Sequence, residues 1–220
     1  MYGLVLIISI LIGLLFIYRE LKNNKIPNNI ILLYLFMLLV FIIICGKLFT
    51  IYTSKKELNI ITAGFSSYGG AIGAIIAVFY FIKVYKEKSN VFINSTILSL
   101  PLIYSLSKIA CSIAGCCYGI EYNGLFHIYN KEVGFNVFPI QMLETLVFFL
   151  IFLYFNKYKN IKYFANKIVI VCALAKFLLD YLRYSHKGII LSVNQIVSLL
   201  MIIISIIIIG INIKKNNKEG

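Results

Sequence analysis

Charged residues are scarce in this chain of 220 residues. They make up 13% of it, whereas a typical soluble domain has about 25%. The hydrophobic fraction is 61% and the mean hydropathy is +0.93, so an ordinary water-soluble domain is excluded. Acidic residues are rarer still, with 8 Asp and Glu against 21 Lys and Arg. The basic residues are scattered between apolar runs, which argues against a nucleic-acid partner.

Tryptophan and long polar segments are both absent. The tryptophan-free, Lys- and Asn-rich composition is typical of an AT-rich bacterial source. A helix that crosses a bilayer needs about 20 residues, so the chain has room for seven or eight spans and no sizeable domain outside the membrane. We therefore expect a single polytopic membrane domain over residues 1–220, and we expect no cofactor.

Seven apolar runs are long enough to cross a bilayer. We expect an all-α integral membrane protein with seven transmembrane helices, at about residues 2–18, 30–52, 64–82, 91–113, 139–155, 168–182 and 189–213. No basic residue precedes the first run and no small-residue cleavage site follows it. We therefore expect it to be a retained helix and not a signal peptide.

The basic residues between the runs predict the orientation, because short basic loops stay cytoplasmic. The connections after the first, third and fifth runs, together with the C-terminal tail, hold 13 Lys and Arg, and the opposite set holds 5. This asymmetry predicts an N-terminus outside and a C-terminus in the cytoplasm. With the bacterial type of composition, we expect a multi-pass protein of the bacterial plasma membrane. The remaining three basic residues are Lys47, Lys108 and Lys176, which lie within the runs.

Ionisable side chains inside the runs are candidates for function, because each is costly in hydrocarbon unless it is paired or hydrated. Besides Lys47, they are Lys108, Glu144, Lys176, Asp180 and Arg183. The last three have the spacing i, i+4 and i+7, which places them on one helical face.

Two interpretations of these charges stay open. In the structural one, Asp180 pairs with Lys176 and Arg183, and Glu144 pairs with Lys108. In the functional one, the excess of positive charge binds an anion, and a lipid phosphate is the anion that a membrane supplies most readily.

Two glycine-punctuated stretches add weaker signals. Gly64 to Gly73 contains four glycines, which either leave backbone N–H groups free for an anion or allow close helix packing. Lys108 to Gly119 contains Cys111, Cys116 and Cys117.

The spacing of these cysteines, with only two distant histidines, argues against a metal site. A disulfide on the outer face, a structural pair of thiols and a nucleophilic cysteine with a thiol pKa lowered by Lys108 all stay open.

With these residues laid out, the chain resembles the prolipoprotein diacylglyceryl transferase family over nearly its whole length. The matching segments, in order, are Tyr2-Gly3-Leu4, Gly46-Lys47-Leu48, Tyr68 to Gly73, Lys108 to Gly119, Pro139 to Glu144, Lys176 to Arg183 and Gln195. The Pro-x-Gln-x-x-Glu segment is intact. Elsewhere Tyr68 stands where the family has histidine, Lys47, Lys108 and Lys176 replace arginines, and Cys111 and Cys116 replace Asn and Glu.

The resemblance implies transfer of a diacylglyceryl group from phosphatidylglycerol to the thiol of a lipobox cysteine in an exported preprotein, with release of glycerol phosphate. It implies catalytic roles for Tyr68, Lys108, Lys176 and Glu144, with both lysines holding the phosphate. The substrate-binding residues that it implies are Tyr2, Lys47, Gly69, Gly70, Cys111, Cys116, Gly119, Gln141, Asp180, Arg183 and Gln195. It implies neither a metal nor a cofactor.

Two alternatives to this function stay open. One is a lipid-binding or transport-like protein that kept the phosphate pocket and lost the transfer chemistry, which Tyr68 in place of histidine favours. The other is a related transferase with a different acceptor.

Overall fold

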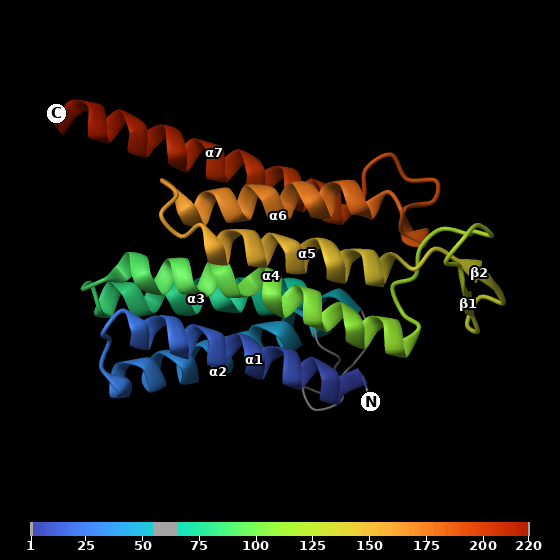
Figure 1. Cartoon of the computed structure of the whole chain (residues 1–220), viewed down its shortest axis with the longest axis horizontal. Coiled ribbons are helices and arrows are strands. Elements are labelled where there is room, and N and C mark those ends of the chain that lie inside the picture. Colours follow the sequence, from blue (N-terminus) through green and yellow to red (C-terminus); the bar gives the residue numbers. More distant parts are fainter. Residues whose placement is uncertain (1, 55–65, 220) are drawn as a thin grey trace. The chain divides into compact units, whose positions relative to one another are not determined.

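The computed structural model describes residues 2–54 and 66–219, without the side chains of residues 53, 54, 67, 68 and 216–219. Within these ranges the chain forms seven α-helices, which Figure 1 labels: α1 Tyr2–Asn23, α2 Asn28–Ser54, α3 Ser67–Val84, α4 Ser89–Ala114, α5 Ile140–Lys157, α6 Phe164–Asp180 and α7 Val193–Glu219. Each predicted run corresponds to one helix. The expected start of the third run, Gly64, lies outside the described residues.

Five of these helices are long and apolar enough to cross a membrane, namely α1, α2, α4, α5 and α7. α3 contains a shorter apolar segment, Gly69–Val84, and α6 has 17 residues. On α7, Ile203, Ile206 and Ile207 are each about half exposed. Such a face suits lipid tails and not water. The chain is therefore a helical, multi-pass membrane protein, and the count of seven spans stays a prediction.

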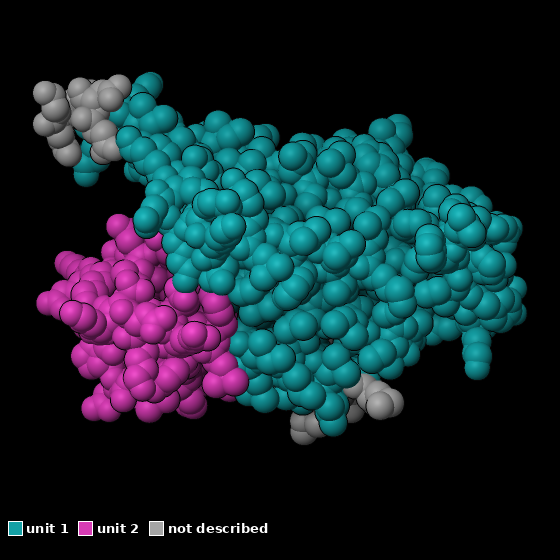
Figure 2. Space-filling model, viewed as in Figure 1, with its two compact units in different colours: residues 1–13, 97–220 teal, residues 14–96 magenta. Residues whose placement is uncertain are grey.

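The chain divides into two compact units, shown in different colours in Figure 2. One comprises residues 1–13 and 97–220, and the other comprises residues 14–96. The single domain expected over residues 1–220 stays a prediction.

The 14–96 unit is held together by aromatic packing and by close contact between α2 and α3. The Tyr34 ring lies 4.8 Å from Phe81 and 5.0 Å from Phe92, centroid to centroid. A Cβ added at Gly69 or Gly73 would collide with the backbone of α2. These two glycines therefore serve close helix packing, the structural interpretation of the glycine stretch.

The connection between α4 and α5 holds a small hairpin that the sequence did not predict. β1 (Ile128–Asn130) pairs antiparallel with β2 (Phe135–Val137). Each strand has only three residues, so hydrophobic alternation has too few positions to show. The hairpin lies beside the start of α5 and forms part of the surroundings of the candidate site.

α6 ends earlier than the sequence predicted. The helix stops at Asp180, and Arg183 has extended backbone angles of −88° and 140°. The prediction that Arg183 shares a helical face with Lys176 and Asp180 is therefore wrong. The physical reason lies in the backbone, because the segment after α6 pairs with residues 118–120 instead of continuing the helix.

Candidate functional site

A buried carboxylate, Glu144, lies at the centre of the candidate site. It belongs to the second turn of α5 and is 1% exposed. Its Oε2 atom lies 3.0 Å from Lys108 Nζ of α4, and its Oε1 atom lies 2.5 Å from Arg183 Nη2. The pairing of Glu144 with Lys108 that the structural interpretation of these charges expected is present, and Arg183 shares the same carboxylate.

Tyr104 links a third cation, Lys176, to the Glu144 carboxylate. Its hydroxyl donates to Glu144 Oε1 at 2.9 Å and accepts from Lys176 Nζ at 3.3 Å and from Arg183 Nη2 at 3.4 Å. The ring centroid lies 5.0 Å from Lys108 Nζ and 4.5 Å from Lys176 Nζ, within cation–π range. Sequence reasoning missed Tyr104. The available signal was its position four residues before Lys108, on the same helical face.

Asp180, at the end of α6, forms a second buried centre. It accepts hydrogen bonds from the Ser192 hydroxyl and from Asn194 Nδ2, the latter at 2.9 Å. Its carboxylate also lies 3.7 Å from Arg183 Nε and 3.7 Å from His186 Nδ1. Asp180 therefore holds the turn into α7 and lies beside Arg183 Nε, while Glu144 binds Arg183 Nη2.

Gln195 supports the same turn. Its Oε1 atom accepts from the backbone N–H of Ser192 at 3.0 Å, and its Nε2 atom donates to the carbonyl of Phe177 at 3.3 Å. Gln195 is fully buried. Both contacts are with the backbone, so the structure gives this predicted substrate-binding residue a role in packing α7 against α6.

An extended segment positions Arg183. Ile120 N–H donates to the Leu182 carbonyl at 3.0 Å, and Tyr184 N–H donates to the Tyr118 carbonyl at 3.2 Å. A Cβ at Gly119 would lie 2.5 Å from the Phe138 carbonyl oxygen and 3.0 Å from that of Leu182. Glycine is therefore required for this close approach.

The Arg183 guanidinium stays charged in this setting. Burial lowers its pKa, but the Glu144 carboxylate together with Tyr104 and Cys117 outweighs that effect, so the pKa lies above the ordinary value for arginine.

Three thiols gather where α4 ends. Cys111 lies in the last turn of α4, and Cys116 and Cys117 lie in the turn that follows; the three sulfur atoms are within 4.8 Å of one another. The pKa of Cys117 is lowered by a hydrogen bond from the Cys111 thiol and by the charges of Lys108 and Arg183, and burial raises the pKa of Cys116. All three are free thiols in the structure.

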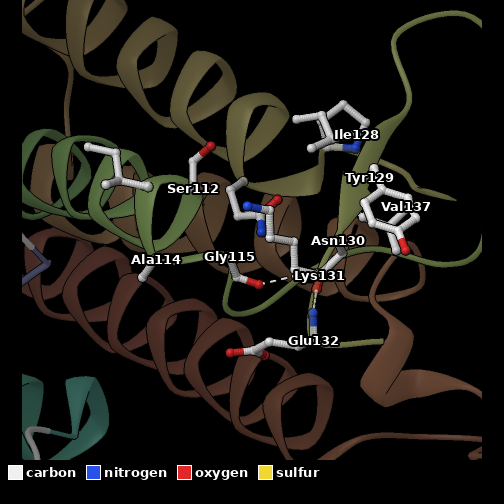
Figure 3. Close-up of a pocket in the computed structure, with 12 residues that line it drawn as sticks. Ser112, Ala114, Gly115, Ile128, Tyr129, Asn130, Lys131, Glu132 and Val137 are labelled. Carbon is white, nitrogen blue, oxygen red and sulfur yellow. Dashed lines mark hydrogen bonds between the residues drawn. The ribbon is translucent and has the colours of Figure 1, made fainter. Parts of the chain in front are cut away.

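A cavity of about 350 Å³ opens between the end of α4, the hairpin and the start of α5. Figure 3 shows Asn130 reaching from the hairpin toward Gly115, whose carbonyl accepts from Asn130 Nδ2 at 2.9 Å. Gln141 lines the cavity and donates to the Cys116 carbonyl at 2.7 Å. One turn of α5 therefore separates the cavity wall from Glu144.

The structure brings most of the predicted site residues into the unit of residues 1–13 and 97–220. Those that meet around Glu144 and Asp180 are Lys108, Lys176 and Arg183, and those beside them are Cys111, Cys116, Gly119 and Gln141. Tyr2 begins α1 in the same unit and is 42% exposed.

Other predicted site residues belong to the 14–96 unit. They are Lys47, Gly69, Gly70 and Tyr68, and the side chain of Tyr68 lies outside the described part of the chain. Their predicted substrate contacts stay predictions.

Fold and site together define a multi-pass membrane protein with a buried cluster of cations around one carboxylate. The family model "Prolipoprotein diacylglyceryl transferase" matches residues 1–211, and the chain belongs to this family. The resemblance drawn from the sequence motifs is thereby confirmed.

Three relatives illustrate the match. The chain is 28% identical over 169 residues to phosphatidylglycerol--prolipoprotein diacylglyceryl transferase 2 of Clostridium perfringens, covering 71% of this chain and 65% of that protein. It is 24% identical over 234 residues to the Clostridium tetani transferase, covering 96% and 92%. The Campylobacter jejuni transferase is 31% identical over 168 residues, covering 70% and 60%.

Proposed function

We propose that this protein transfers a diacylglyceryl group from phosphatidylglycerol to the thiol of a lipobox cysteine in a prolipoprotein. The observation that carries the proposal is the Glu144 carboxylate, which is held between Lys108 and Arg183 and linked through Tyr104 to Lys176. This arrangement supplies more positive than negative charge inside a membrane protein, and the names of the relatives supply the substrates.

The reaction forms a thioether bond and breaks a phosphoester bond. The acceptor sulfur attacks the glyceryl carbon, the carbon–oxygen bond to the phosphate breaks, and glycerol phosphate leaves with the electron pair while the thiol proton passes to a base. Negative charge therefore develops on the departing phosphate. Cations fixed at that position stabilise it, and removing one such group typically costs an enzyme about 10²–10³ in rate.

Each residue of the cluster has a distinct task in this scheme. Lys108 and Lys176 hold the phosphate, Arg183 and Asp180 shape the outer end of the pocket, and Glu144 orients the cations. Tyr68 occupies the position from which the family's histidine acts and takes the thiol proton in this proposal.

We also propose seven spans, with the N-terminus outside and the C-terminus in the cytoplasm of a bacterial plasma membrane. The ends of α4 and α6 and the start of α5 all meet at the candidate site. With the N-terminus outside, these three ends face the outer side of the membrane. An exported preprotein would then meet the site in the outer half of the bilayer.

The decisive experiment is a transfer assay with purified protein in phosphatidylglycerol vesicles. A lipobox peptide should gain the mass of the diacylglyceryl group on its cysteine thiol. Lys108→Ala and Lys176→Ala should each lower turnover at least tenfold, and Lys162→Ala, which removes an exposed lysine from the α5–α6 connection, should leave it unchanged. Normal turnover in both site variants would refute the roles given to these lysines.

The assay also separates the alternatives. Binding of phosphatidylglycerol without transfer would favour a lipid-binding protein, as the replacement of histidine by Tyr68 suggests. Release of glycerol phosphate that does not depend on the lipobox peptide would favour a different acceptor.

A further inference from the structure

Three cysteine side chains converge at the C-terminal end of α4, and the reaction scheme proposed above assigns no step to their sulfur atoms. Cys111, Cys116 and Cys117 have sulfur atoms within 4.8 Å of one another. From this convergence we infer that the three thiolates bind one thiophilic cation with a filled d shell, Zn²⁺ or Cu⁺.

The spacing of the sulfur atoms suits a shared ion. Thiolates bind such ions at about 2.3 Å, so three sulfurs on one ion lie about 4 Å apart. The observed spread needs only a small contraction to reach that geometry. Cys111 belongs to the last turn of α4, whereas Cys116 and Cys117 follow the helix, and rotation about their Cα–Cβ bonds changes the distances between the sulfur atoms.

The backbone of the turn directs the thiols back toward the helix. Gly115 has a φ of +70° and Cys117 a φ of +57°, both in the left-handed region. That region is unfavourable for a cysteine, so the turn is held in this shape by its surroundings. The Asn130 and Gln141 side chains do so, because they donate to the carbonyls of Gly115 and Cys116.

The three thiols differ in burial, so the cluster has a buried end and an exposed end. Cys111 is buried, Cys116 is partly buried and Cys117 is exposed. An ion can therefore arrive from solvent at Cys117 and be enclosed at Cys111. A Cu⁺ ion is satisfied by three sulfurs in a plane, whereas Zn²⁺ takes an additional ligand such as water in its fourth position.

The site escapes recognition in the sequence because its ligands do not follow a paired Cys-x-x-Cys pattern. The turn after α4 replaces that pattern by bringing residues five and six positions after Cys111 back beside it. An ion there would tie the end of α4 to the segment that leads into Gly119. It would thus stabilise the pairing that positions Arg183, and its role would be structural.

The test is a metal titration of the full-length protein in detergent, reduced and stripped with a chelator. Zn²⁺ is titrated against a chromophoric chelator, Cu⁺ is titrated anaerobically against a copper-specific one, and Co²⁺ reports sulfur ligation through its charge-transfer absorption. We expect one ion per chain in at least one of the first two titrations. Cys111→Ser, Cys116→Ser and Cys117→Ser should each weaken binding at least tenfold and diminish the cobalt–sulfur absorption.

Cys172→Ser is the matched control, because it removes a thiol of α6 that lies outside the cluster, and it should bind like the unaltered protein. If Cys111→Ser fails to fold, the exposed Cys117→Ser variant carries the same test. Bound ion should also raise the melting temperature of the unaltered protein but not that of Cys117→Ser.

Three results would overturn the inference. They are the absence of any stoichiometric ion, equal binding by a variant that lacks all three thiols, and a thiol count showing that two of the three are joined as a disulfide in the protein as isolated.

Discussion

At the scale of single residues, the most informative feature is one carboxylate shared by two cations. Glu144 contacts both Lys108 and Arg183, and Tyr104 connects it to Lys176. Three basic groups thus surround one acid, and the second acid, Asp180, lies 3.7 Å from Arg183 Nε and 3.7 Å from His186 Nδ1. A purely structural ion pair needs only one cation for each carboxylate. The surplus is what a site for an anionic headgroup requires.

Glu144→Gln should therefore damage both stability and activity. The substitution keeps the size of the side chain but leaves Lys108 and Arg183 buried without their counter-charge, and breaking a buried pair in this way costs about 3–5 kcal/mol. We expect a lower melting temperature in detergent and at least a tenfold loss of peptide lipidation. Glu121→Gln, at an exposed carboxylate of the α4–α5 connection, should behave like the unaltered protein.

Tyr104→Phe should show whether the Tyr104 hydroxyl orients the buried cations or binds the lipid. It keeps the ring beside both lysines and removes the hydroxyl that contacts Glu144, Lys176 and Arg183. A buried polar group left without its partner costs about 1–3 kcal/mol, so we expect turnover to fall about tenfold while phosphatidylglycerol binding changes little.

Measured kcat and lipid affinity would check this expectation, with Tyr129→Phe in the hairpin as the control. Equal losses of binding and turnover would instead show that the hydroxyl acts on the bound lipid itself.

At the scale of elements, short extended segments complete a site that the helices alone leave open. Residues 118–120 lie between the start of α5 and the chain that leaves α6, and their hydrogen bonds fix Arg183. The β-hairpin then encloses the cavity beside Gln141. The helices supply the buried charges, and the extended segments supply the arginine and the cavity wall.

Gly119→Ala tests whether the extended segment of residues 118–120 positions Arg183. Its Cβ would press on the Phe138 and Leu182 carbonyls, so the segment must shift and Arg183 must move away from Glu144. We expect at least a tenfold loss of activity and a destabilisation of about 1–3 kcal/mol, as for other changes at strained positions. Gly210→Ala in α7 meets no atom within 4 Å and should be neutral or slightly stabilising. Full activity in Gly119→Ala would contradict the positioning role of the segment.

The sequence predicted the helices better than the connections between them, for a physical reason. A long apolar run is a local signal, and an intramembrane charge such as Lys108 or Glu144 must find a partner, so both could be predicted. The end of α6 could not be predicted, because it depends on backbone pairing with residues some 60 positions earlier. Tyr104 was missed because, in an apolar run, the sequence does not distinguish a tyrosine that contacts charged groups from one that only packs in the core.

At the scale of the whole molecule, the chain is a helical membrane protein whose orientation is predicted from its basic loops. Substituted-cysteine labelling on intact cells would test it, in a background without the five native cysteines. Tyr129→Cys in the hairpin should react with a membrane-impermeant maleimide. Lys159→Cys, between α5 and α6, should react only after permeabilisation, because short basic loops stay cytoplasmic. The reverse pattern would invert the topology and place the site on the inner side.

Because Arg183 follows the last turn of α6, the backbone holds the two cations on Glu144 with different rigidity. Lys108 is carried by a continuous helix, whereas Arg183 depends on a few backbone hydrogen bonds of an extended segment. Small units of this kind open at lower free energy than helices packed in a core. Amide exchange should therefore be faster at Ile120 and Tyr184 than within α4 and α5. An opening of that kind would release the guanidinium while Lys108 stayed bound to Glu144, and the headgroup of a lipid could be admitted without disturbing any helix.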